Sequence, residues 1–145
     1  MTIFEALRAD HDPQRTLIDL LCKTEGDSEG RQELFDKVRL ELSAHAKAEE
    51  RHFYVPLMEV DMTQEKARHS VAEHHELDEM IEELTATDRS SPHWLAVAKQ
   101  LQHKLHHHLE EEEQEVFPVA GRVLNDSQKD QLASDYRKLM DEEKA

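Results

Sequence analysis

One arrangement of side chains that could bind a metal occurs twice in this sequence of 145 residues. Each copy contains two aliphatic residues, a histidine and a glutamate, with spacings of four, three and four residues. The copies are Val38, Leu42, His45 and Glu49, and then Leu101, Leu105, His108 and Glu112. On an α-helix these positions fall within a sector of roughly 60°, so the histidine and carboxylate share the face that should be buried. Imidazole beside carboxylate is a ligand set that divalent metals accept.

The composition is typical of a single helical domain. The chain has three Gly, four Pro and 35% charged residues, and its runs of Glu, Lys, Leu and Ala favour helices over strands. A chain of 145 residues can bury one hydrophobic core. We therefore expect one all-α domain over residues 1–145.

The charge of the chain excludes several classes of partner. The formal net charge is −15 with neutral histidines, and binding to nucleic acid or anionic membranes needs clustered Lys and Arg. No apolar run approaches the roughly 20 residues that cross a bilayer, and the segment from Met1 to Ala9 lacks the pattern of a signal peptide. We expect a cytoplasmic protein. The single Cys22 excludes an intrachain disulfide.

Capping residues and prolines divide the chain into helices. Thr2 and Glu5 predict a capping box for a first helix, which Pro13 should kink after His11 or restart with Asp12 as its cap. The later helices are expected over about residues 30–54, 63–86, 91–117 and 127–142. Four long helices with short loops predict an antiparallel up-down-up-down four-helix bundle with a short C-terminal fifth helix.

Prolines and capping residues mark where the middle helices are expected to start and end. Thr63 should cap the third helix, while Pro56 should discourage continuation of the second and Pro118 should do the same for the fourth. Ser91 followed by Pro92 is a strong start signal for the fourth helix.

The second half of the chain repeats the first at a distance of 63 residues, which predicts half-repeats over about 1–60 and 63–120. His74 corresponds to His11 in this register, so each of the four helices contributes to one inward cluster. The predicted metal ligands are His11, His45, Glu49, His74, His108 and Glu112. Four imidazoles and two carboxylates suit two metal ions, because carboxylates can bridge the pair and leave positions for a small ligand.

Several other side chains compete with these ligands. His107 and Glu111 share the four-residue spacing, but they lie roughly 100° from the face of Leu105. His52 comes three residues after Glu49, so it shares the site face and could supply a further nitrogen. The remaining candidates, for which exposed or packing roles compete, are His69, His75, Glu115 and Tyr54.

The chain resembles the hemerythrin-like family, also called HHE cation-binding domains, in which a lone His followed by His-x-x-x-Glu is given twice. The matching segments are Asp10-His11, His45-Ala-Lys-Ala-Glu49, Glu73-His74-His75 and His108-Leu-Glu-Glu-Glu112. The resemblance implies a non-haem di-iron centre, with two iron ions bridged by an oxo or hydroxo group, in a four-helix bundle. It also implies a small diatomic or peroxide ligand, such as oxygen, nitric oxide or hydrogen peroxide, and a redox partner that the sequence does not identify.

One departure from the family bears on function. Oxygen-carrying hemerythrins have a fifth histidine four residues before or after the first one on the third helix, where this chain has Ser70 and Asp78. Fewer protein ligands admit more solvent and oxidant to the ions, which favours a di-iron oxidoreductase that handles peroxide or nitric oxide over reversible oxygen binding. The alternative is a non-catalytic protein that stores metal or senses oxygen or iron.

Overall fold

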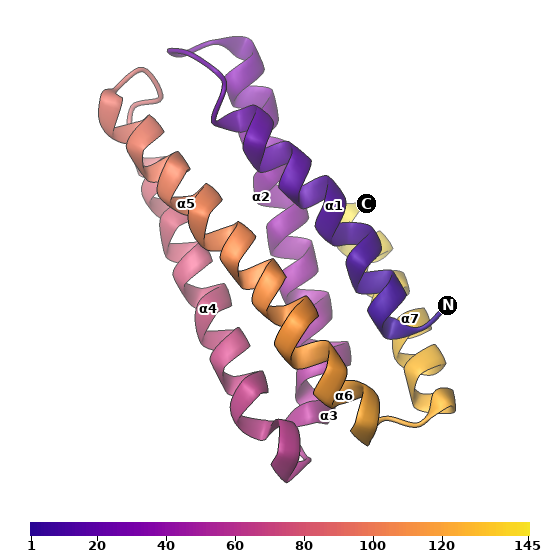
Figure 1. The fold of residues 1–145 in the computed structure, drawn as a ribbon. Helices are drawn as coiled ribbons and strands as arrows, with labels where there is room; N and C mark the ends of the chain where they lie inside the picture. The colour runs from indigo at the N-terminus through magenta and orange to yellow at the C-terminus, as the bar shows by residue number, and fades with distance from the viewer.

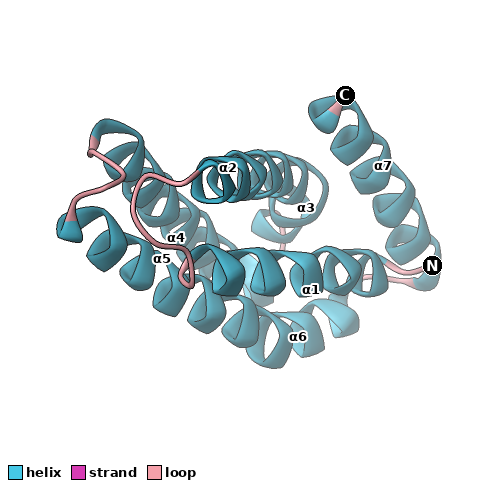
Figure 2. Cartoon of the chain, turned by 90° about the horizontal axis from the view of Figure 1, so that it is seen from above, coloured by secondary structure: helices cyan, strands magenta, loops and turns pink.

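Four long helices form an antiparallel bundle in the computed structural model, which describes residues 1–145 and contains no strand (Figure 1). They are α1 (Ile3–Leu21), α2 (Glu29–Glu49), α4 (Asp61–Ala86) and α5 (Pro92–Glu111). A further helix, α7 (Asp126–Lys144), packs against α1 and α2 on the side away from α4 and α5 (Figure 2). The expected four-helix bundle with a C-terminal fifth helix is confirmed. No helix combines the length and apolar character needed to cross a membrane.

Both α2 and α5 lead through a wide π-helical turn into a short α-helical segment that runs past the expected end of the helix. These turns and the short helices that follow are η1 (Glu50–Tyr54) with α3 (Val55–Met58), and η2 (Glu112–Val116) with α6 (Phe117–Val123). The prediction that Pro56 and Pro118 end the helices is therefore wrong. Each proline occupies one of the first two positions of the new α-helical segment, where its fixed φ is compatible with the helix.

Helix α1 begins with the predicted capping box, in which Thr2 accepts from the backbone N–H of Glu5 and Glu5 accepts from that of Thr2. The helix then runs unbroken through Pro13, so the predicted restart at Asp12 is wrong. Pro13 leaves the carbonyl of Ala9 without its helical donor, but both residues are exposed and water can satisfy this carbonyl.

The predicted cap of the third helix is also wrong. Helix α4 starts at Asp61, and Val60 is its N-cap residue without a side-chain hydrogen bond. Thr63 is buried, and its hydroxyl donates to the carbonyl of Leu57 over 2.7 Å, which joins α4 to α3. The start of α5 is as predicted, because Ser91 accepts from the backbone N–H of Trp94.

Two hydrophobic clusters fill the interior, one at each end of the bundle. One contains Leu7, Phe53 and Phe117 and extends to α7, and the other contains Ile18 and Trp94. On α1, His11 lies between Leu7 and Ile18, so the polar cluster lies between the two apolar ones. Apolar layers on both sides reduce water access and strengthen electrostatic interactions among its side chains.

Candidate metal centre

The structure brings the six predicted ligands together at mid-height in the bundle. They form two groups whose donor atoms lie within 4.8 Å of one another, namely His11, His45, Glu49 and Glu112, and then Glu49, His74, His108 and Glu112. All six residues are buried. Each group contains two histidines, and both groups share the two glutamates.

Each shared glutamate directs one oxygen to each group. Glu49 places Oε2 3.5 Å from His45 Nε2 and Oε1 3.0 Å from His74 Nε2. Glu112 places Oε1 3.1 Å from His11 Nε2 and Oε2 3.8 Å from His108 Nε2. Glu49 and Glu112 could therefore each offer one oxygen to each of two metal positions, and each position has two imidazoles.

The other ring nitrogen of each histidine has a partner outside the cluster. Three of these partners are carboxylates, and they accept from Nδ1 in the pairs His11–Glu113 at 2.8 Å, His74–Glu50 at 3.0 Å and His108–Glu73 at 2.9 Å. Because an ionised carboxylate can only accept, Nδ1 carries the hydrogen in each ring. In the neutral imidazole Nε2 then has a lone pair, which it directs into the cluster as a metal ligand requires.

Several donor atoms of the cluster lack hydrogen-bonding partners in the protein. They are the Nε2 atoms of His11, His45 and His108, both side-chain oxygens of Glu49, and Oε1 of Glu112. A buried polar atom without a partner costs about 1–3 kcal/mol. Metal ions between the shared carboxylates would satisfy these atoms, so the residues present fit a pair of metal ions.

The electrostatics of the cluster show the same need for positive charge. Burial and the nearby Glu49 raise the pKa of the Glu112 carboxyl well above its usual range. Burial also raises the pKa of Glu49, but the imidazoles of His45 and His74 outweigh burial and hold that pKa well below its usual range. Two fully buried carboxylates in one cluster therefore compete for the available protons, and bound cations would remove this competition.

The π turns decide which side chains follow the two glutamates on the site face. In η1 the N–H of Val55 bonds to the carbonyl of Glu50, five residues earlier. The wider turn brings Tyr54 into the cluster, where its hydroxyl donates to Glu112 Oε2. His52 instead lines a surface cleft beside α7 and belongs to neither group. The prediction that His52 shares the site face is wrong, because it assumes regular α-helical spacing after Glu49.

The other competing side chains lie outside the buried centre. His75 and Glu115 are exposed, and neither belongs to a group of candidate ligands. His107 is 65% exposed and pairs with Glu111 on the surface. His69 forms a separate surface group with Glu73 and Glu111. The choice of His108 over His107 agrees with their positions in the structure.

Sequence reasoning missed the residues that hold the histidines. Glu50 directly follows Glu49, and Glu113 directly follows Glu112, at the 63-residue spacing of the repeat. In the same register, an acidic residue precedes each lone histidine, Asp10 in the first half and Glu73 in the second. An acidic residue repeated beside His11, His74 and the two glutamates was therefore an available signal for these hydrogen-bonding partners.

Comparison with known proteins agrees with this geometry. Residues 2–120 match the model of the hemerythrin HHE cation-binding domain. The chain belongs to this family. Domains of the family bind metal cations, and the buried His and Glu groups of this HHE domain could hold them.

Two individual proteins are similar to this HHE domain. A DNA nickase from Nostoc sp. strain PCC 7120 is 26% identical over 137 residues, which cover 94% of this chain and 38% of the nickase. The chain thus spans well under half the length of that relative. A crystal structure of a hemerythrin HHE cation-binding domain-containing protein from Mycobacterium kansasii has a TM-score of 0.88 at 23% identity, covering 99% of this chain and 88% of that one. This likeness shows the same fold.

Proposed function

We propose that this protein holds a non-haem di-iron centre that binds and reacts with oxygen or related small oxidants, namely peroxide and nitric oxide. The observation that carries the proposal is the sharing of Glu49 and Glu112 between two groups of donors. Mixed imidazole and carboxylate ligation suits iron, which His11 and His45 would hold at one position and His74 and His108 at the other. Bound there, iron supplies electron transfer and open coordination positions.

The number of protein donors favours exchange of small ligands. Each group offers two imidazoles and two shared carboxylates, which leaves about two positions on an ion of octahedral geometry. Neither Ser70 nor Asp78, which stand where a further histidine would add a ligand, belongs to either group. We infer that both ions accept exogenous ligands, which supports turnover more than reversible carriage.

A small internal cavity beside the cluster supports a ligand of this size. It measures ≈10 Å³ and is lined by Gln14, Leu42, His45, Ala46, His74, Leu77, Asp78, Leu105, His108 and Leu109. This volume accommodates about one water-sized molecule. Gln14 is only 2% exposed, and neither its amide nitrogen nor its amide oxygen has a hydrogen-bonding partner in the protein. The amide is thus available to a small ligand in the cavity.

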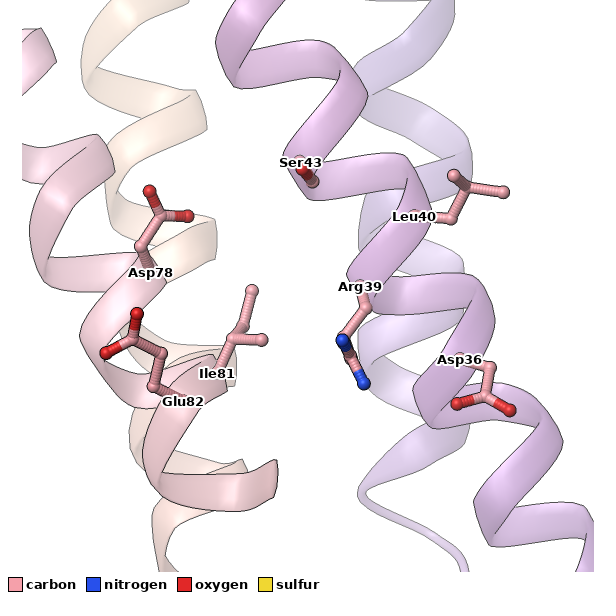
Figure 3. Close-up of a pocket in the computed structure, with 7 residues that line it drawn as sticks. All are labelled: Asp36, Arg39, Leu40, Ser43, Asp78, Ile81 and Glu82. Atoms are coloured by element: carbon pink, nitrogen blue, oxygen red, sulfur yellow. The ribbon is translucent and has the colours of Figure 1, made fainter. Parts of the chain in front are cut away.

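A surface cleft offers a route to this cavity. The cleft measures ≈490 Å³ and lies between α2 and α4, lined by Asp36, Arg39, Leu40, Ser43, Asp78, Ile81 and Glu82 (Figure 3). Asp78 lines both the open cleft and the buried cavity. Asp78 thus lies where the cleft and the cavity adjoin, and the small size of the cavity restricts entry to small molecules.

The proposal is tested by mixing reduced, iron-loaded protein with oxygen and following the visible spectrum, with a parallel assay of peroxide consumption. We expect a short-lived spectral change and peroxide loss that depends on iron. Glu49→Gln should abolish both, whereas Glu115→Gln, on an exposed residue, should leave both unchanged. A spectrum that persists for hours and reverses under vacuum would indicate an oxygen carrier instead.

The alternative function is storage of metal or sensing of oxygen or iron. It takes precedence if fully iron-loaded protein shows neither a spectral change with oxygen nor loss of peroxide. DNA nicking, named for the Nostoc relative, is not proposed, because this chain covers 38% of that protein. The net charge of −15 on this chain also repels the phosphate groups of DNA.

A further inference from the structure

A second pair of His-x-x-x-Glu motifs lies outside the buried centre, on neighbouring helices. His69 and Glu73 are on α4, and His107 and Glu111 are on α5. His69 Nε2 lies 3.0 Å from Glu111 Oε1 and 3.4 Å from Glu73 Oε1. Together His69, Glu73 and Glu111 place three potential ligand atoms within 4.8 Å of one another.

Two carboxylate oxygens in the outer cluster face the same nitrogen of His69. One imidazole nitrogen carries at most one hydrogen, so His69 Nε2 cannot donate fully to both carboxylates. His107 Nε2 lies 3.0 Å from Oε2 of Glu111, which leaves Oε1 directed toward His69 and Glu73. No lysine or arginine pairs with either carboxylate, and Lys104 on the same side of α5 pairs with Glu76.

The cluster is also shaped to receive an ion from solvent. The carboxylates are recessed, with Glu73 8% and Glu111 23% exposed, whereas the His69 side chain is 57% exposed. An ion can therefore approach past the imidazole and meet the two carboxylate oxygens beneath it. The helices fix the spacing, since each contributes residues one turn apart on one face.

We propose that His69, Glu73 and Glu111 form a third cation site, which binds one divalent ion of the borderline class such as Zn²⁺ or Co²⁺. One imidazole and two carboxylates supply three donors, and water completes the coordination. His107 orients Glu111 through the oxygen that does not face the ion. The site uses none of the six candidate ligands of the buried centre.

Glu73 connects the outer site to the buried centre. Its Oε1 atom accepts from His108 Nδ1 over 2.9 Å and also faces the outer cluster. An ion bound to this oxygen withdraws electron density from it and weakens the hydrogen bond that orients His108. Occupation of the outer site should therefore shift the absorption spectrum of an iron-loaded buried centre.

The test is a titration of iron-loaded protein with Co²⁺, followed by the visible absorption of Co²⁺ and by elemental analysis of both metals. We expect one additional Co²⁺ per chain with no loss of iron. His69→Ala and Glu111→Gln should each weaken this binding by at least about tenfold, because each removes one of three protein donors. The matched controls His75→Ala and Glu110→Gln, on exposed residues of the same helices, should bind Co²⁺ as the unmodified protein does.

Three outcomes would overturn the proposal. They are the absence of Co²⁺ uptake, uptake that displaces an equal amount of iron, and uptake that is the same in the His69→Ala and control variants. Far-UV circular dichroism establishes that each variant keeps its helices. The iron content of the variants separates a failure of the outer site from a failure of the buried centre.

Discussion

The Nδ1 atom of His45 donates to the hydroxyl of Tyr136 over 2.6 Å, and this hydroxyl donates to Asp10 over 2.6 Å. In the second half of the repeat Glu73, which corresponds to Asp10, accepts directly from His108. Aspartate is one methylene shorter than glutamate, and the Tyr136 hydroxyl bridges Asp10 and His45. Helix α7 lies outside the matched family residues 2–120, yet it holds one ligand of the candidate centre.

Tyr136→Phe should weaken metal binding about 10–100-fold, because His45 loses the acceptor that orients its ring. It should also lower the free energy of unfolding by about 1–3 kcal/mol, since a buried N–H is left without a partner. Chelator competition and urea denaturation measure the two effects. Lys138→Ala, on an exposed residue of α7, serves as the control. Equal metal affinity in both variants would show that α7 only packs against the bundle.

His108→Ala should reduce bound iron below the two ions per chain expected for the unmodified protein. The variant removes one of four donors at one position and leaves the other position intact. His103→Ala changes an exposed histidine of the same helix and should keep the full iron content. Elemental analysis after desalting provides the measurement, and equal iron in both variants would contradict the ligand assignment.

Removal of metal should lower the melting temperature by several degrees or more. Metal at about a thousand times its dissociation constant stabilises the folded state by about 4 kcal/mol, and each kcal/mol shifts the melting temperature of a chain of this size by about 2–4 °C. Differential scanning calorimetry of loaded and chelator-treated protein measures the change. Identical melting would mean that water already satisfies the buried donors.

The metal-free protein should lose stability as the pH rises from about 6.5 to 9. Burial lowers the pKa of His11, but the adjacent carboxylates of Glu112 and Glu113 favour the protonated imidazole, outweigh burial and raise the pKa from 6.5 to about 9. Glu49 and Glu50 similarly overcome burial and raise the pKa of His74 to about 9. Between these pH values the folded state holds protons that the unfolded state has released, so rising pH favours unfolding.

The metal-loaded protein should not show this decline, because ions have replaced the protons on the two histidines. Melting temperatures of both forms across the pH range provide the measurement. Loading at pH 7 should also release protons, which calorimetry detects by comparing buffers with different ionisation enthalpies. The same pH dependence in both forms would show that His11 and His74 do not exchange protons for metal.

Gln14→Leu should weaken the binding of a small ligand, with nitric oxide as the probe, by about tenfold, which corresponds to one hydrogen bond of about 1.4 kcal/mol. The same change should leave the iron content unaltered and raise stability, because it removes a buried amide without protein partners. Gln114→Leu changes an exposed glutamine and serves as the control. Unaltered nitric oxide affinity in Gln14→Leu would show that the Gln14 amide does not bond to the ligand.

Local sequence patterns predicted the long helices and the six buried candidate ligands, because the helices and the positions of these side chains follow regular helical spacing. The register shared by His45 and His108 could be read from residues on one helix face. The errors at His52 and Pro56 come from η1, where the backbone hydrogen bond spans one residue more than in an α-helix, a change that helical spacing does not predict. Tyr136 could not be predicted either, since its contact with His45 spans 91 residues and depends on how α7 packs.

The two groups of candidate ligands have different surroundings despite the internal repeat. Tyr54 corresponds in the repeat to Phe117, and its hydroxyl meets the Glu112 oxygen that faces His108. The Phe117 ring instead stacks on His11, with centroids 6.1 Å apart. The group that contains His108 thus has a hydroxyl donor beside it, and the group that contains His11 has an apolar ring. Metal ions held by these residues would therefore meet different surroundings at the two positions, and their reduction potentials would differ.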